Sequence, residues 1–553
     1  MKVYWAVVLS VCLIMGLLTG CATKKDKENT DTPPEENAVT PTGDNVSNDG
    51  GKEIVLPKNL KIYGGIGNNS IEGGAKDNND LLAFQLMEKM TGTHVEWTHP
   101  AQGAIDEQFN LLIASGEYPD AIIYKWPTVP GGVSSYAEDD VIIELTDMIE
   151  TCMPNLWAYL QENPDVKKQI SDDEGRIFYI PFIRKDDSLR YFMGYQTRSD
   201  FLEAVDMEVP KTIDELYDLL VAYKKQDFSG NGVEKGYPLT GVGFDGFFGI
   251  GKLLWSFGTT YDFHLGDDGK VVYGPMTDDF VEGLTFIRKL YEEGLIDPDY
   301  LLNDRATMDS NVMNGISGVI YSYQSTKYYT SESFNDGTKK IIAIPALAGP
   351  DGKNYSFNTD YTNAVVIGTT LAITTENKNP EGTLAWLDNF YGGEGYNYAN
   401  FGEEGVTYNW VDGYPKYTDV MFKNPDDPGM AVGSIFGINC LAFATSFPML
   451  QDGRYYEQYL SEWASENIND WVADEPDMSR VLPKTLTFTE EENKVIAQAM
   501  AQIKTYVSTA WNNVVIGKMD ISEWNNVREQ LVNMGIEDVV KIYNDSYDRY
   551  QNR

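Results

Sequence analysis

The chain has 553 residues, which is too many for a single hydrophobic core, so two lobes or domains are expected. Its formal net charge of -41 argues against nucleic acid, which requires clusters of Lys and Arg, and against docking onto an anionic lipid surface. The acidity is typical of a well-solvated protein, and it disfavours an anionic ligand.

The first twenty residues have the segment order of a bacterial secretion signal. Lys2 supplies a positive charge, an apolar run follows, and the segment leads into Leu18-Thr19-Gly20-Cys21. This ending resembles a lipobox, which implies cleavage before Cys21 and diacylation of its thiol. The mature protein would then be held by lipid on the extracytoplasmic face of a bacterial cell membrane. The alternative is a retained single-pass anchor, although the apolar run is near the lower limit for spanning a bilayer.

Residues 21–53 have the composition of a flexible spacer. They are rich in Lys, Asp, Glu, Asn, Thr, Pro and Gly and show no hydrophobic periodicity. Such a segment cannot bury enough apolar surface to offset the entropy lost on ordering. We expect it to carry a folded domain away from the membrane.

The remaining chain alternates strand and helix patterns from residue 59 onwards. Strands are predicted at 59–63, 95–97 and 120–124, with helices at 80–90 and 105–114 between them. This alternation indicates an α/β lobe with a mainly parallel sheet. Later helices are predicted at 212–223, 279–293, 379–391 and 489–511, and later strands at 318–323, 341–344 and 365–373. Thr212 with Glu215, and Thr489 with Glu492, form capping-box patterns at two helix starts.

Cysteine and histidine patterns point to no catalytic or metal site. Cys152 and Cys440 remain after removal of the signal, and they could form a disulfide or stay as two buried thiols. The sequence has no HExxH, CxxC, Walker-type or GxSxG pattern. Carboxylates are abundant, but none is singled out as an acid/base pair.

Several longer segments together resemble one family. From about Leu60 to Tyr550 the chain is similar to the large lipoprotein branch of the family 1 extracellular solute-binding proteins, the carbohydrate-capturing subunits of ABC importers. The segments that carry this resemblance are MTGTHVEW, LLIASGEYPDAIIY, TRSDFLEAVDMEVPKTIDELYDLLVAYKKQDFSGNG, EGLIDPDY, NPEGTLAWLDNFYGGEGYNYANFGEEGVTYNWVDGYPKYTD, PKTLTFTEEENK and MGIEDVVKIYNDSYDRY.

The resemblance implies an α/β, two-lobed, periplasmic-binding-protein-like (type II) fold with a hinge and a cleft between the lobes. It further implies a monomer that binds an oligosaccharide, passes it to ABC permease subunits and catalyses no reaction. We assign 54–188 to lobe 1, 189–315 to lobe 2, 316–376 to a return into lobe 1, and 377–553 to lobe 2.

Two other functions fit the composition. The 35 Tyr, 11 Trp and 23 Phe residues suit stacking on sugar rings, and they would equally suit an extracellular glycoside hydrolase, which needs two facing carboxylates. A binding protein for a non-sugar solute, such as a peptide, is the other alternative.

Candidate ligand residues come from three segments. Trp126 follows a predicted strand, where α/β lobes place ligands. Asp245, Phe247 and Trp255 lie in a segment rich in Gly and aromatic residues that, by resemblance, reaches the cleft. Tyr321, Tyr323 and Gln324 end a strand that, by resemblance, returns to the first lobe near the hinge. For Trp126 and Trp255 the competing interpretation is core packing, and for the two tyrosines it is ordinary strand alternation.

A turn at residues 227–233 resembles the first half of an EF-hand-type calcium loop. Asp227, Ser229, Asn231 and the Val233 carbonyl occupy the alternating ligand positions. Lys235 stands where metal-binding relatives carry an acidic residue. No cofactor is therefore required, and the alternative to a structural calcium is a Gly/Asn turn that keeps its shape without metal.

Overall fold

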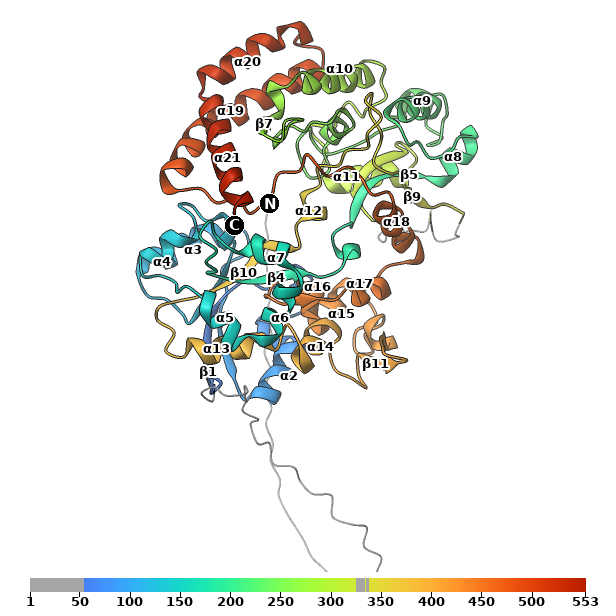
Figure 1. Ribbon diagram of the computed structural model, residues 1–553. Coiled ribbons are helices and arrows are strands. Elements are labelled where there is room, and N and C mark those ends of the chain that lie inside the picture. Colours follow the sequence, from blue (N-terminus) through green and yellow to red (C-terminus); the bar gives the residue numbers. More distant parts are fainter. Residues whose placement is uncertain (1–53, 325–333, 335–337) are drawn as a thin grey trace, which may run out of the picture. The chain divides into compact units, whose positions relative to one another are not determined.

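The computed structural model describes residues 54–324, 334 and 338–553, all within the unit Asn45–Arg553 (Figure 1). The predicted signal peptide, Cys21 and the spacer lie outside the described residues. Within the described ranges, no helix combines the length and the apolar character needed to cross a membrane.

The first lobe is built on a mixed sheet with strand order β13-β4-β10-β3-β1-β2. β1 pairs in parallel with β2 and β3, β4 pairs in parallel with β13, and β10 runs antiparallel between β3 and β4. The strands are β1 (Asn59–Tyr63), β2 (His94–Thr98), β3 (Ala121–Tyr124), β4 (Ile180–Arg184), β10 (Val365–Ile373) and β13 (Leu450–Gln451). The predicted alternation of strand and helix is therefore confirmed for this lobe.

The carboxyl ends of β1, β3 and β4 meet at one edge of this sheet, because the three strands point the same way. Tyr63, Tyr124 and Arg184 are the last residues of these strands and therefore lie along that edge. Parallel strands of α/β lobes present ligands at such an edge.

Helices cover the sheet and complete the first core. They are α1 (Asn68–Glu72), α2 (Leu82–Thr91), α3 (Ile105–Ser115), α4 (Val133–Glu138), α5 (Thr146–Cys152), α6 (Pro154–Glu162), α7 (Pro164–Ile170), α13 (Pro380–Asp388), α14 (Gly393–Phe401), α15 (Val432–Asn439), α16 (Leu441–Ala444) and α17 (Gly453–Tyr459). A hairpin of β11 (Tyr408–Val411) and β12 (Tyr414–Tyr417) stands apart from the sheet. Cys152 and Cys440 are both buried as reduced thiols, which settles the open question of a disulfide.

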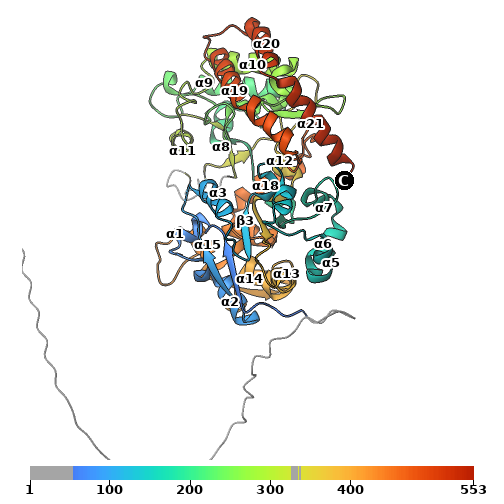
Figure 2. The ribbon, with the colours of Figure 1, turned by 90° about the vertical axis from the view of Figure 1, so that its left-hand side faces the viewer.

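The second lobe has a smaller sheet, of order β8-β5-β9, and a helical cover. Its strands are β5 (Met193–Arg198), β8 (Val319–Tyr323) and β9 (Ile341–Ala343), with a separate pair β6 (Phe263–Leu265) and β7 (Val271–Tyr273). Its helices are α8 (Ser199–Val205), α9 (Ile213–Lys224), the 3-10 helix η5 (Ile250–Phe257), α10 (Asp278–Glu292), α11 (Arg305–Met313), α18 (Glu462–Ala473), α19 (Glu490–Val515), α20 (Trp524–Asn533) and α21 (Ile536–Gln551). Both predicted capping boxes are present, at the starts of α9 and α19. Figure 2 shows α19, α20 and α21 packed together on this lobe.

Two of the four segments were assigned to the wrong lobe from the sequence. Residues 316–376 do not return as a block, because β8 and β9 pair with β5 in the second lobe and only β10 enters the first sheet. Residues 377–553 do not all belong to the second lobe, since those up to α17 pack in the first core. The chain passes between the cores near 190–192, through α12 (Thr359–Thr362), and near 460–467. A short apolar strand has the same pattern in either sheet, so its pairing partner could not be read from the sequence.

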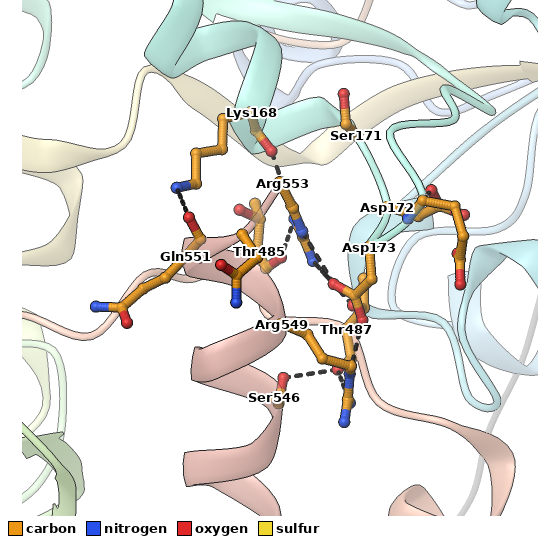
Figure 3. Close-up of polar contacts among 12 residues, drawn as sticks. Lys168, Ser171, Asp172, Asp173, Thr485, Thr487, Ser546, Arg549, Gln551 and Arg553 are labelled. Carbon is orange, nitrogen blue, oxygen red and sulfur yellow. Dashed lines mark hydrogen bonds and ion pairs between the residues drawn. The ribbon is translucent and has the colours of Figure 1, made fainter.

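A cluster of ion pairs joins the end of α21 to the first lobe (Figure 3). Asp173, in the turn after α7, accepts hydrogen bonds from Arg549 Nε at 2.8 Å and from Arg553 Nε and Nη2 at 3.0 and 2.9 Å. Arg549 also pairs with Glu492 of α19 at 2.8 Å, and Arg553 Nη1 donates to the Thr485 carbonyl at 3.1 Å. We call Asp173, Arg549 and Arg553 the α21 clamp. It is a non-covalent link between the lobes in addition to the three chain crossings.

Candidate functional site

A cavity of about 290 Å³ lies where residues of the second lobe meet the α12 crossing. We call it the aromatic cavity. Its lining residues are Met193, Phe247, Lys252, Trp255, Thr260, Tyr261, Asp262, Phe263, Tyr321, Phe357, Asn358, Thr359, Asp360, Val481, Leu482 and Lys484.

A second cavity, of about 360 Å³, continues from the first toward the first lobe. The two cavities share Asp262, Phe263, Leu482 and Lys484. The second is closed on its other side by residues 127–133 and 170–172 of the first lobe. The site therefore extends from the aromatic cavity to the space between the two cores.

The backbone around η5 brings two candidate ligand-binding side chains to the same wall. The preceding segment is rich in glycine, and a Cβ atom on Gly249 would lie 2.2 Å from the Phe244 carbonyl oxygen. Only glycine permits this close approach, and η5 begins directly after it. In a 3-10 helix, residues three apart lie on one face, so Lys252 and Trp255 both line the aromatic cavity.

Aromatic rings form the wall and the mouth of the cavity. Trp255 and Tyr321 meet edge to face, with ring centroids 5.5 Å apart, and both are buried. Phe247 and Tyr323 lie 5.4 Å apart and remain 48% and 38% exposed. Exposed ring faces beside a cavity offer the surface on which an apolar ligand face can stack.

Charged groups near the cavity are mostly paired with each other. Lys484 Nζ lies 2.7 Å from Asp360 Oδ1, and Arg184 lies 3.8 Å from the same oxygen. Arg305, beside Tyr323, pairs with Asp309 at 2.9 Å.

Lys252 differs from these cations. Its Nζ hydrogen-bonds to Tyr261 Oη at 3.0 Å, and no carboxylate of a described residue forms an ion pair with it. Burial lowers the pKa of Lys252 to about 8, although Asp245 and Asp360 act in the opposite direction.

The predicted ligand residues divide into three groups. Phe247, Trp255 and Tyr321 line the aromatic cavity, and Tyr323 contacts Phe247 at its mouth. Gln324 does not line it, but its side chain donates to Tyr456 Oη of α17 and so joins the two lobes. The exposed Asp245 is not a lining residue either and acts on Lys252 only through its charge.

Trp126 is a core residue, contrary to the expectation from sequence. Its ring is completely buried, its Nε1 donates to the Ile122 carbonyl at 2.9 Å, and Phe109 and Tyr136 pack edge-on against it. The chain turns sharply after β3, and this folds the indole back over its own strand.

Sequence reasoning missed Lys252, Tyr261, Asp360 and Lys484. The Lys252–Trp255 spacing of three was available as a signal, but it identifies one face only once the 3-10 helix is known. Nothing local marks Asp360 or Lys484, because they are brought together across 124 residues of chain.

The loop proposed for calcium is closed by its own hydrogen bonds. Asp227 Oδ2 accepts from Gly232 N at 3.0 Å, and Ser229 Oγ accepts from Asn231 N at 3.2 Å. The loop offers one carboxylate, two neutral side-chain oxygens and the Val233 carbonyl. Calcium takes six to eight oxygens, several of them usually from carboxylates, so this donor set fits the ion poorly.

Comparison with known proteins identifies the family. The model of the family described as "Bacterial extracellular solute-binding protein" matches residues 70–397. The chain belongs to this family.

Two curated relatives align over most of this solute-binding protein. It is 29% identical over 502 residues to the fructooligosaccharide ABC transporter substrate-binding protein FusA of Streptococcus pneumoniae, covering 86% of this chain and 88% of FusA. It is 25% identical over 480 residues to the lipoprotein LipO of Bacillus subtilis, covering 84% and 88%.

Solved structures of relatives have the same two-lobed fold. The structure of FusA in complex with kestose matches with a TM-score of 0.67 at 25% identity, covering 89% of this chain and 99% of that one. Another matching structure is of a FusA EF-hand mutant, with a TM-score of 0.67 and 26% identity. The predicted α/β, two-lobed fold is thereby confirmed.

Proposed function

We propose that this protein is the substrate-binding subunit of an ABC importer and that it captures an oligosaccharide in the cleft between its lobes. The observation that carries the proposal is the aromatic cavity, in which Trp255, Tyr261 and Tyr321 lie beside Lys252 and Asp360. Sugar rings offer C–H faces to aromatic planes and hydroxyl groups to charged and amide partners. The similarity to FusA, whose name specifies a fructooligosaccharide, supports the same class of ligand.

The proposed function also covers the membrane anchor of the protein and the absence of catalysis. Cys21 would carry the lipid anchor, and the relative named lipoprotein LipO supports this placement on the extracytoplasmic face. The protein acts as a monomer, delivers its ligand to permease subunits and turns nothing over. The loop of Asp227 needs no calcium for this role.

Closure about the chain crossings would trap the sugar. Three segments join the lobes, and Phe247 and Tyr323 stand exposed at the mouth of the aromatic cavity. A hinge motion of this kind brings the two walls of a cleft together around a ligand. The exposed rings would then become covered.

Calorimetric titration tests the proposal directly. Soluble protein from residue 54 onwards is titrated with kestose, nystose, maltotriose, lacto-N-tetraose and trigalacturonate. Binding of at least one glycan, with no release of reducing ends on prolonged incubation, is expected. Release of reducing ends would replace the proposal with a glycoside hydrolase, and binding of peptides alone would replace the ligand class.

A further inference from the structure

Lys252 occupies an unusual place in the aromatic cavity. Its Nζ lies 5.0, 5.3 and 5.7 Å from the ring centroids of Trp255, Tyr261 and Tyr321. These three rings are themselves cavity walls. An ammonium held over several ring faces is stabilised electrostatically without a counter-ion, so the rings hold this charge at the cavity wall.

The ammonium also has hydrogen-bonding capacity that no described residue uses. A lysine ammonium has three N–H donors, and the hydrogen bond to Tyr261 Oη accounts for one of them. Lys484 and Arg184 are engaged by Asp360, and Arg305 by Asp309. Among the charged side chains described here, Lys252 is therefore the one best able to offer a positive donor to a ligand.

A small third cavity is also lined by Lys252. It has a volume of about 30 Å³ and is lined by Lys252, Trp255, Tyr195 and Tyr321 among others. Trp255 Nε1 and Tyr195 Oη are buried and hydrogen-bond to no described residue. The space is large enough for a water molecule. Two polar atoms therefore lie behind the ring wall, next to a space that can hold a water molecule.

The charges lining the aromatic cavity balance. Lys252 and Lys484 are offset by Asp262 and Asp360, and Asp245 adds a further negative charge near Lys252. A ligand carboxylate would face these acidic groups, whereas a neutral sugar would not. The local balance therefore favours a neutral ligand, in agreement with the acidity of the whole chain.

We propose that Lys252 is a specificity-determining residue, which donates from its ammonium to hydroxyl oxygens of a neutral sugar unit held against Trp255 and Tyr321. This inference rests on the proposed function and assigns a role within the same site. Hydrogen bonds from a charged donor are about twice as strong as neutral ones. Lys252 would then provide the strongest single polar contact to the sugar.

The test compares Lys252→Met with a matched control, Lys353→Met. Methionine keeps an unbranched apolar chain against the rings and removes the ammonium. Lys353 also lies over a tyrosine ring of the second lobe, 5.3 Å from the Tyr355 centroid, but it is 55% exposed and lies outside the cavity. Affinities for kestose, nystose, maltotriose and lacto-N-tetraose are measured by calorimetry, with trigalacturonate as the anionic probe.

Loss of the charged donor should weaken binding of the neutral glycans about 10- to 100-fold in Lys252→Met. Lys353→Met should bind like the wild type. Wild-type affinity should also fall as the pH rises through about 8, where the ammonium loses its proton, and this fall should be absent in Lys252→Met. Asp245, Tyr261, Tyr321, Asp360 and Lys484 are the other titratable groups facing Lys252, and the variant leaves them in place.

Each outcome separates the inference from the proposed function. If the wild type binds a neutral glycan and Lys252→Met binds it equally well, the role of Lys252 is overturned while the function stands. Tighter binding of trigalacturonate than of every neutral glycan would overturn the assignment of a neutral ligand. If the wild type binds none of these glycans, both the function and the role of Lys252 fail.

Discussion

Replacing Asp173 by alanine should destabilise the protein, because this one carboxylate pairs with both arginines of the α21 clamp. The side chain of Arg553 is 1% exposed and that of Asp173 is 16% exposed, so their ion pair is largely withdrawn from water. Removing one partner of a buried pair typically costs about 3–5 kcal/mol. Here Arg549 keeps Glu492, and Arg553 keeps the Thr485 carbonyl. We therefore expect a loss of about 2–3 kcal/mol.

The measurement is urea unfolding of Asp173→Ala at neutral pH, with Asp278→Ala as the control. Asp278 also accepts from an arginine, Arg528, at 2.9 Å, but its side chain is 95% exposed. An exposed pair contributes at most about 1 kcal/mol. If Asp173→Ala destabilises the protein no more than Asp278→Ala, the clamp is not a significant link between the lobes.

The effect of the clamp should depend on pH in a defined direction. Burial alone would raise the pKa of Asp173, but hydrogen bonds from Thr487, Arg549 and Arg553 outweigh it and hold the pKa below its ordinary value. A carboxyl group with a lowered folded-state pKa stabilises the fold fully above its unfolded value, near 3.9, and loses that effect as the pH falls through the folded pKa. The difference between wild type and Asp173→Ala should therefore be constant at neutral pH and shrink below about pH 4. A difference unchanged down to pH 2 would contradict this account.

Four further predictions test the site, the hinge, the loop and the anchor. Trp126→Ala should lower the free energy of unfolding by about 3–5 kcal/mol, whereas Phe247→Ala should weaken glycan binding by about 1–3 kcal/mol and leave the melting temperature nearly unchanged. Small-angle scattering should show a smaller radius of gyration at saturating glycan, and an identical curve would indicate a rigid receptor. Adding EDTA or calcium should not shift the melting temperature; a shift that Asp227→Ala abolishes would restore the metal site. Cys21→Ala should release the protein from membranes in cells, and retention after a carbonate wash would indicate a membrane-spanning anchor.

Local signals in the sequence were sufficient for the α/β character and for several helix ends. The capping boxes at Thr212 and Thr489 depend on residues only three apart, and both are present in the structure. The apolar run that forms β3 likewise appears as a strand buried along its whole length. The sequence does not predict which strand pairs with which. Nothing in the residues of β8 indicates pairing with β5 rather than with a strand of the first sheet.

The two tryptophans show why the site was predicted only in part. Both follow a strand or a glycine-rich turn, and both have polar and apolar neighbours, so composition does not separate them. Trp126 is drawn into the core because its Nε1 reaches the Ile122 carbonyl, which satisfies the polar atom inside the lobe. Trp255 Nε1 is buried without such a partner, and its ring shares a cavity wall with Lys252. The buried indole N–H of Trp126 is satisfied within its own lobe, whereas Trp255 lies in the wall of a ligand-sized cavity, which is why Trp255 and not Trp126 belongs to the proposed site. This distinction depends on contacts across the fold, and the sequence contains it only implicitly.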